Sequence, residues 1–385
     1  PPSSFPEYTE PGGTKYIYSD ASFWTSGFFP GCLYLLRERQ LKHPTRFPYH
    51  HDGRPTIHPT LLDFASKWWA SAPAQQASRT DTHDLGFMIQ PWAALGLTLD
   101  GDATCRAAIV TGARSLASRF DARVGAMRSW DGCETRAYKY DDAQTDFLVV
   151  IDNMMNLDLL YHAAALTGDL ALAHIATTHA HTTLRTHVRP DASTAHLVVH
   201  DASTGGVKAV LTHQGYRDAS CWARGQAWAM CGFAQCYRRV REPAFLEAAV
   251  ATSAYWLRRT TTGVIAPWDF DAEEERGEGE PRDASAALVA AYAMLLVYEA
   301  LVEEGGRGEE AEGFLRGALG GVRAVVEGCL GGEGGDDGGL ESVVMHATIN
   351  NYEHALRRWS DTGLVYADYY FLLVGNKLLE MGLVK

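Results

Sequence analysis

The sequence predicts an all-α fold, a closed double ring of helices, on three observations. Nearly every apolar segment has the 3.6-residue period over about 14 to 23 residues, and period-two alternation is confined to 197–200 and 207–211. Successive helices follow one another through short turns, as in αα-hairpins. Helices that are apolar on all sides alternate with helices that carry charge, as an inner and an outer layer would.

Eleven helices are expected, with boundary errors of about 2 to 4 residues. Six hairpins close such a ring, so eleven helices are one short. We expect the missing helix either upstream of Pro1 or within the irregular N-terminal stretch 1–26. The expected helices span 27–42, 57–72, 84–97, 103–120, 152–167, 170–186, 221–240, 243–259, 283–302, 308–330 and 361–381.

Two places show the pairing and the layering most clearly. Gly168 ends one helix and Asp169 caps the next, so the turn between them is very short. Segment 283–302 is apolar on every side, as a fully buried inner helix must be. Its successor, 308–330, carries glutamates and arginines along its length, as an outer helix would.

Composition excludes several classes of protein. With 46% hydrophobic and 21% charged residues, the chain can bury a large core and is not disordered. The 34 Lys+Arg against 47 Asp+Glu give a net charge of −13, which argues against nucleic-acid binding. Seven scattered cysteines without a C-x-x-C pair fit neither a disulfide scaffold nor a zinc ribbon. The longest apolar run, 286–298, is too short to cross a membrane, which takes about 20 residues, so we expect a soluble protein.

The loops and the chain ends complete the organisation. A single domain over 1–385 is expected, because the Gly-rich connector 331–339 is followed by the same helical pattern. The sequence opens without an initiator methionine or a readable leader; we expect a cytoplasmic protein, and the oligomeric state stays open. Four long loops rich in Gly, Asp and aromatic residues are expected to carry function: 121–151, 187–220, 260–282 and 331–360.

Acidic residues at helix starts are the main candidates for chemistry, because the sequence has no phosphate-binding loop, nucleophile elbow or zinc-protease motif. Asp152 opens a helix among bulky apolar side chains. The helix dipole favours its anion and burial favours its neutral acid. Asp84 repeats this arrangement in HDLGFM. Each could simply cap its helix, whereas two carboxyls facing one lumen would leave one protonated, as general acid catalysis requires.

The segment WARGQAW places Arg224 and Trp228 four residues apart, on one helical face. Together they could bind a carboxylate and stack on a sugar ring, or the indole could simply pack under the arginine stem. Asp283 is expected to cap the apolar helix that follows it.

Histidines suggest two further sites, both of which we interpret as structural. His174 and His181 share a helical face and could be imagined to hold a metal. No carboxylate ligand accompanies them, and the neighbouring threonines indicate an exposed outer helix, so no metal is expected. His50-His51-Asp52 is expected to be a polar loop.

Seven motifs in order resemble family 88 of the glycoside hydrolases, the unsaturated glucuronyl hydrolases, over about 24–371. The resemblance implies an (α/α)6 barrel without cofactor. It implies a substrate too, the oligosaccharides that polysaccharide lyases leave with a 4,5-unsaturated uronic acid at the non-reducing end. The motifs are DNMMNL at 152–157, HDLGFM at 83–88, HQGY at 213–216, WARGQAW at 222–228, PWDFD at 267–271, RDASAA at 282–287 and YADYYF at 366–371.

The resemblance also assigns roles. Asp152 would protonate C4 of the enol ether and then activate the water that attacks C5. Asp84 would hold sugar hydroxyls and help keep Asp152 protonated. The substrate contacts implied are His83, His196, Gln214, Arg224 and Trp228, with Trp24 and Trp130 as stacking platforms.

Three rival functions stay open at this stage. Family 105, the unsaturated rhamnogalacturonyl hydrolases, uses the same barrel and chemistry on pectin fragments, but DNMMNL and RGQAW favour family 88. A sugar epimerase on the same toroid would need motif-placed histidine pairs. A catalytically silent binding toroid would be expected to lack one of the acids. Arg217 and Lys208 are candidates for contacting a sulfated neighbouring sugar.

Overall fold

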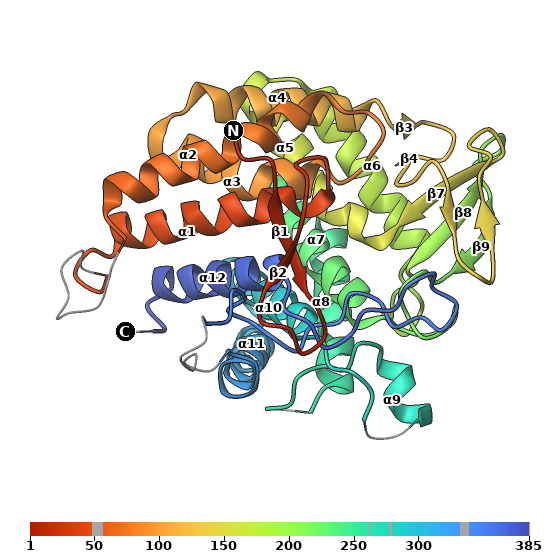
Figure 1. Ribbon diagram of the computed structural model, residues 1–385. Coiled ribbons are helices and arrows are strands. Elements are labelled where there is room, and N and C mark those ends of the chain that lie inside the picture. Colours follow the sequence, from red (N-terminus) through yellow and green to blue (C-terminus); the bar gives the residue numbers. More distant parts are fainter. Residues whose placement is uncertain (48–56, 262, 277–278, 332–338, 385) are drawn as a thin grey trace.

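The computed structural model describes residues 1–47, 57–261, 263–276, 279–331 and 339–384. Within these ranges the long helices form two layers (Figure 1). Each inner helix packs against two inner neighbours, and the ring closes where the last one meets the first. The inner helices are α1 (Phe28–Lys42), α3 (Leu85–Asp100), α5 (Leu157–Thr167), α7 (Ala223–Val240), α10 (Ala284–Glu304) and α12 (Val365–Glu380).

The outer layer pairs with the inner one as expected. Its helices are amphipathic and pack on the preceding inner helix, so each pair is an αα-hairpin. All eleven predicted helices are present, with ends that differ by a few residues. The outer helices are α2 (Pro59–Gln75), α4 (Ala103–Ala117), α6 (Leu170–Thr186), α8 (Pro243–Arg259) and α11 (Gly308–Gly328).

The N-terminal stretch contains a β-hairpin where a twelfth barrel helix was one of two expectations. Strands β1 (Phe5–Thr9) and β2 (Tyr16–Ser19) pair, and the 3-10 helix η1 (Trp24–Gly27) follows. The expectation of a helix within 1–26 is therefore wrong. The hairpin is held against the chain before and within α12, because Thr9 N donates to Gly363 O at 3.0 Å and Tyr16 Oη donates to Asp368 at 2.8 Å.

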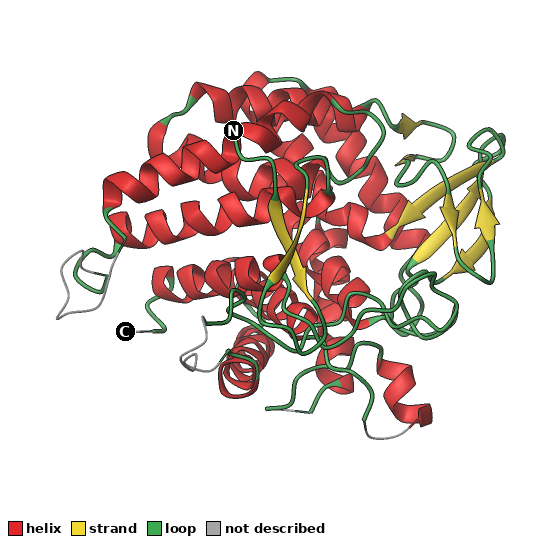
Figure 2. Cartoon of the chain, viewed as in Figure 1, coloured by secondary structure: helices red, strands yellow, loops and turns green. Residues whose placement is uncertain are grey.

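A three-stranded antiparallel sheet beside the barrel leads into the site (Figure 2). Strands β8 (Leu197–Asp201) and β9 (Val207–Leu211) confirm the two predicted stretches of alternation. Strand β7 (Asp146–Val150) pairs with β8 and has apolar neighbours on both faces, which is why it shows no alternation. Four strands of two residues each make the small hairpins β3–β4 (Phe120–Asp121, Ala126–Met127) and β5–β6 (Cys133–Glu134, Lys139–Tyr140).

Besides η1, three short helices in the described residues were not predicted as such, and the 3-10 helix η2 (Gln76–Ser78) after α2 is one of them. The 3-10 helix η3 (Ile151–Asn156) replaces the first turn expected of the helix at 152–167, and α5 continues from it. Helix α9 (Phe270–Arg276) lies within the loop 260–282 and is too short for periodicity to show it. It begins after Asp269, whose carboxylate accepts the backbone N–H of Asp271 at 3.0 Å.

The innermost wall of the barrel is α10. By length and composition this helix could cross a membrane, but 78% of its apolar window is buried inside the protein. Asp283 accepts the backbone N–H groups of Ser285 and Ala286 and so caps it, as predicted. Most of the predicted connector at 331–339 and all of His50-His51-Asp52 lie outside the described residues.

Candidate active site

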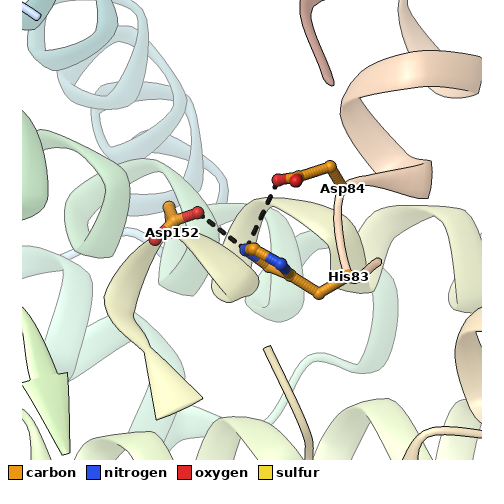
Figure 3. Close-up of side chains that lie close together, drawn as sticks. All are labelled: His83, Asp84 and Asp152. Atoms are coloured by element: carbon orange, nitrogen blue, oxygen red, sulfur yellow. Dashed lines mark hydrogen bonds and ion pairs between the residues drawn. The ribbon is translucent and has the colours of Figure 1, made fainter. Parts of the chain in front are cut away.

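Two aspartates and a histidine meet at the starts of two inner segments (Figure 3). Asp84 directly precedes α3, and Asp152 lies in the first turn of η3. His83 Nε2 lies 2.9 Å from Asp152 Oδ2 and 3.4 Å from Asp84 Oδ1. Each aspartate side chain is 17% exposed, whereas the imidazole is 2% exposed. The two carboxyls therefore reach solvent while the histidine between them is buried.

A glycine allows the two segments to approach this closely. A Cβ on Gly86 would lie 2.5 Å from the Cα of Asn156, a distance that no real side chain tolerates. The amide of Asn156 completes the contact by accepting the backbone N–H of Phe87 at 3.1 Å. The first turn of α3 thus lies against the end of η3, and this contact fixes the distance between the acids.

Neither carboxyl caps its helix. Asp84 occupies the position before α3 but accepts no backbone N–H of that helix; it accepts the hydroxyl of Thr82 at 3.0 Å. Asp152 makes no capping bond to η3 either. An aspartate at a helix start ordinarily stabilises the helix by capping it, and neither of these two carboxyls makes that contribution.

The surroundings shift the pKa values of the two acids in opposite directions. Burial favours the neutral form of Asp152, but the hydrogen bond and charge of His83 outweigh it and lower the pKa below 3.8. Burial and the charge of Asp152 raise the pKa of Asp84 above 3.8. Burial alone would lower the pKa of His83, but the two carboxylates raise it above 6.5. In the free protein His83 thus favours the Asp152 anion, and the role of Asp84 in helping to keep Asp152 protonated stays a prediction.

Aromatic rings and neutral histidines surround the acids. The Trp130 ring makes edge contacts with His83 at 6.4 Å and His196 at 6.2 Å between centroids. His196 Nδ1 accepts the backbone N–H of His213 at 3.0 Å, and burial lowers the pKa of His196 to about 3. His196 is therefore neutral near pH 7. The structure brings Trp130 and His196 to the acids, as predicted from the sequence.

Trp222 is a neighbour of the site that the sequence reasoning missed. Its indole packs against the His196 ring at 4.6 Å and under the Arg224 guanidinium at 4.6 Å. Its Nε1 and the Nε2 of His196 are buried and have no hydrogen-bond partner in the described part of the chain. The motif WARGQAW contained the signal, because Trp222 opens it.

Arg224 forms a buried ion pair. Its guanidinium donates to Asp283 at 2.6 Å and to the backbone carbonyls of Thr348 and Ile349. Its ring partners among the described residues are Trp222 and Tyr366, which does not support the alternative that the Trp228 indole packs under the arginine stem. With a side chain 2% exposed, Arg224 acts here as a bridge between α7, the start of α10 and the loop 331–360.

Three other predicted contacts lie further from the acids. Trp228 is 2% exposed and packs on Phe87 and Tyr370. Trp24 packs on Phe87 as well, so both indoles belong to an aromatic layer one turn into the barrel. Gln214 Nε2 donates to the Ile349 carbonyl at 2.8 Å. Beyond this layer a cavity of about 530 Å³ opens; its lining does not include the three residues of the acid cluster.

The acid cluster has a spacing that a divalent cation could use, since one ligand atom each from His83, Asp84 and Asp152 lie within 4.8 Å of one another. The histidines of α6 are used separately. His179 accepts the backbone N–H of Met127 at 3.0 Å, and His181 pairs with Glu242. His179 is fully buried, although α6 is the outer helix that its threonines predicted.

No family model matches the sequence. Two curated relatives carry the name unsaturated glucuronyl hydrolase. The protein from Formosa agariphila is 31% identical over 360 residues, 91% of this chain and 78% of its own length. The protein from Bacillus sp. strain GL1 is 28% identical over 369 residues, 96% of this chain and 89% of its own length.

Solved structures give the same comparison in three dimensions. An unsaturated glucuronyl hydrolase specific for heparin superposes with a TM-score of 0.80 at 29% identity, over 100% of this chain and 92% of the other. The crystal structure of the Bacillus sp. GL1 enzyme, responsible for degrading glycosaminoglycan, gives 0.80 at 26% identity, over 99% and 92%. A structure named for UGL and the oligosaccharide dGlcA-Glc-Rha-Glc gives 0.78 at 27% identity, over 99% and 92%.

Proposed function

This chain belongs to the unsaturated glucuronyl hydrolase family, and we propose from that premise that Asp152 and Asp84 hydrate the C4=C5 bond of a terminal unsaturated uronic acid. The enzyme is thus a glycoside hydrolase acting on an oligosaccharide, within an (α/α)6 barrel. The observation that carries the site assignment is the pair of uncapped, partly exposed carboxyls held on either side of one buried imidazole.

The chemistry needs only a proton donor and a base. The C4=C5 bond is part of an enol ether, so a proton added to C4 leaves a positive charge shared between C5 and the ring oxygen. Water then attacks C5 and loses a proton to the base. The resulting hemiketal opens and releases the neighbouring sugar. Carboxylate separation does not decide inversion or retention here, because the anomeric carbon is not attacked.

Asp152 is the proposed proton donor and base, and substrate binding favours its protonated form. In the free protein His83 keeps the pKa of Asp152 low. A uronate brought beside these carboxyls adds negative charge and excludes water, and both effects raise carboxyl pKa values. The cluster of His83, Asp84 and Asp152 titrates as one unit, so its exchangeable proton can move to Asp152 when substrate binds. Asp84 then takes the sugar hydroxyls as hydrogen-bond acceptor.

Trp130 and His196 are proposed as the sugar contacts closest to the acids, since both rings lie against the cluster. The proposed roles of Arg224 and Trp228 are indirect. Arg224 holds the backbone at Thr348 and Ile349 against α7, and Trp228 forms part of the layer beneath the site. Gln214 anchors the same segment through Ile349.

We propose that the sugar next to the uronate carries no sulfate. The two cations considered for sulfate binding are both neutralised. Arg217 pairs with Glu275, and Lys208 pairs with Asp146. An added sulfate would have to displace one of these carboxylates before either cation could bind it. A cytoplasmic location stays a prediction from the sequence.

A panel of unsaturated disaccharides tests the function. The double bond absorbs in the ultraviolet, and its loss on hydration is the readout. We expect turnover of unsulfated unsaturated chondroitin and heparin disaccharides, with lower kcat/KM for sulfated forms. Turnover restricted to pectin-derived disaccharides would indicate a rhamnogalacturonyl hydrolase, and turnover of none would indicate an epimerase or a binding protein.

The same assay tests Asp152. Asp152→Asn should lower kcat by at least about 10²-fold, the usual contribution of a general acid or base. Circular dichroism and melting should match the wild type, because Asp152 caps nothing. Near-normal turnover by this variant would contradict the assignment of Asp152 as the general acid and base.

A further inference from the structure

His83 is placed to serve both carboxyls from a single nitrogen. Its Nε2 lies 2.9 Å from Asp152 and 3.4 Å from Asp84 (Figure 3). The ring is buried, with Trp130 against it. His196 is buried as well, so the expectation that His83 contacts the sugar directly stays a prediction.

The position of the proton on His83 follows from its surroundings. Its Nδ1 is buried and has no hydrogen-bond partner in the described part of the chain. A buried N–H without an acceptor is rarer than a buried acceptor without a donor. When the imidazole is neutral, its proton therefore belongs on Nε2, between the two carboxyls. One N–H makes one strong, linear hydrogen bond at a time, so it has to favour one acid over the other.

The other nearby donors are committed elsewhere. The charge of Arg119 influences the cluster, but its guanidinium donates to Asp131 at 2.9 Å and to backbone carbonyls, that of Thr80 among them. Thr82 donates its hydroxyl to Asp84 only. Among the hydrogen bonds of the described residues, His83 is thus the side-chain donor that reaches Asp152.

We infer that the Nε2–H of His83 follows the negative charge during the reaction, pointing to Asp84 while Asp152 is protonated and to Asp152 once its proton has gone to C4. This inference rests on the proposed function. The proton that forms the C4–H bond leaves the Asp152 carboxyl, and the proton on Nε2 stays on the imidazole throughout. When Asp152 takes a proton from the attacking water, the Nε2–H returns to Asp84.

The consequence is catalytic rather than a gain in substrate binding. A hydrogen bond to a carboxylate is stronger than one to a neutral acid. The bond from His83 to Asp152 therefore strengthens as Asp152 becomes an anion, which occurs as the transition state forms. An interaction that is stronger in the transition state than in the ground state raises kcat and leaves KM nearly unchanged. His83 is a positioning residue that acts through Asp152.

Two substitutions separate the hydrogen bond from the shape of the ring. His83→Gln keeps an N–H donor near the Nε2 position, and His83→Leu removes it. In His83→Leu we expect kcat to fall by about 10- to 100-fold, the range for losing a hydrogen bond to a charged group, with KM within about twofold. His83→Gln should recover most of that loss. His162→Leu, a half-buried histidine beside Gln90 in α3, is the matched control and should keep wild-type kcat.

The outcomes separate the inference from the proposed function. Equal losses of kcat in His83→Gln and His83→Leu, or a change confined to KM, would overturn the inference. Turnover by the wild type would still support the proposed function. Loss of wild-type turnover in EDTA, restored by Zn²⁺, would make the three residues a metal site and overturn the inference as well. Circular dichroism checks the fold of each variant. A wild type inactive on every unsaturated disaccharide would instead contradict the proposed function.

Discussion

At the scale of single residues, the two acids of this site differ from other aspartates at helix starts because they do not cap a helix. Asp283 shows the ordinary use of a helix-start aspartate, because it caps α10 and pairs with Arg224. Asp84 occupies the same N-cap position before α3, and Asp152 lies in the first turn of η3, whose N-cap is Val150; both stay partly exposed. The difference is set by His83, whose ring occupies the space between them.

The pH dependence of kcat/KM reports on the shared proton. The reaction needs one exchangeable proton on the carboxyls of the cluster, and burial together with the charge of Asp152 raises the pKa of Asp84 and so retains that proton to higher pH. As pH rises through that pKa the proton is lost, so kcat/KM should fall on an alkaline limb. In His83→Gln the positive charge that His83 can carry is lost, so the pKa values of the two carboxyls should rise and the limb should move to higher pH. An unchanged limb in this variant would contradict the account.

The ion pair of Arg224 should matter for stability. Arg224→Gln leaves the fully buried Asp283 without its charge partner, and breaking a buried pair in this way costs about 3 to 5 kcal/mol. Arg238→Gln removes an exposed pair with Glu299 and should cost at most about 1 kcal/mol. Urea denaturation of both variants measures the difference. Equal free energies of unfolding for the two would show that Arg224 is not structural.

At the scale of elements, the contact between α3 and η3 sets the spacing of the acids. Gly86→Ala would force a Cβ onto Asn156, and we expect a loss of about 1 to 3 kcal/mol in stability together with a lower kcat. Gly313→Ala is the matched control, because that glycine of α11 has open space around it. It should gain up to about 1 kcal/mol from its higher helix propensity. Thermal melting and the absorbance assay measure both variants, and equal effects at the two positions would contradict this reading.

Elements with a clear period could be predicted from the sequence, and those without one could not. The helices have periodic patterns of apolar residues, and β8 and β9 lie where the sequence alternates, although the side chains of β9 are largely exposed. Strand β7 is covered on both sides, so its apolar run carries no period. The change from 3-10 to α-helix at Leu157 depends on packing between segments far apart in the chain.

The site could be predicted only in part, because several of its contacts join residues that are far apart in the sequence. Asp84 and Asp152 lie in the motifs, His196 and Trp130 are implied by the family resemblance, and the structure brings the four together. The partner of Arg224 lies 59 residues away and its carbonyl acceptors 124 and 125 residues away, which no local pattern reveals. The direction of the Asp152 pKa depends on His83, and no spacing in the sequence shows the distance between them.

At the scale of the whole molecule, the ring is closed by its own ends. Helix α12 packs between α10 and α1, and the hairpin of β1 and β2 lies against the chain before α12. No group of helices has a core separate from the rest, since most of the buried apolar residues form one continuous cluster.

We therefore expect the protein to unfold as one cooperative unit. Differential scanning calorimetry should show a single transition whose calorimetric and van't Hoff enthalpies agree. Two resolved transitions would show that part of the barrel is stable without ring closure.

The bonds that join the hairpin to the start of α12 have a consequence for how the chain is made. Tyr16 bonds to Asp368 across 352 positions of sequence, and Gly363 bonds to Thr9 across 354. Contacts this distant form only after synthesis has passed Asp368, and a fold that depends on them is completed slowly. During synthesis the apolar faces of the first helices stay uncovered until α12 has been made. Early release or heat stress in that interval would therefore lead to aggregation. A newly made chain would for that reason depend on chaperones more than a barrel whose first helices could close on themselves.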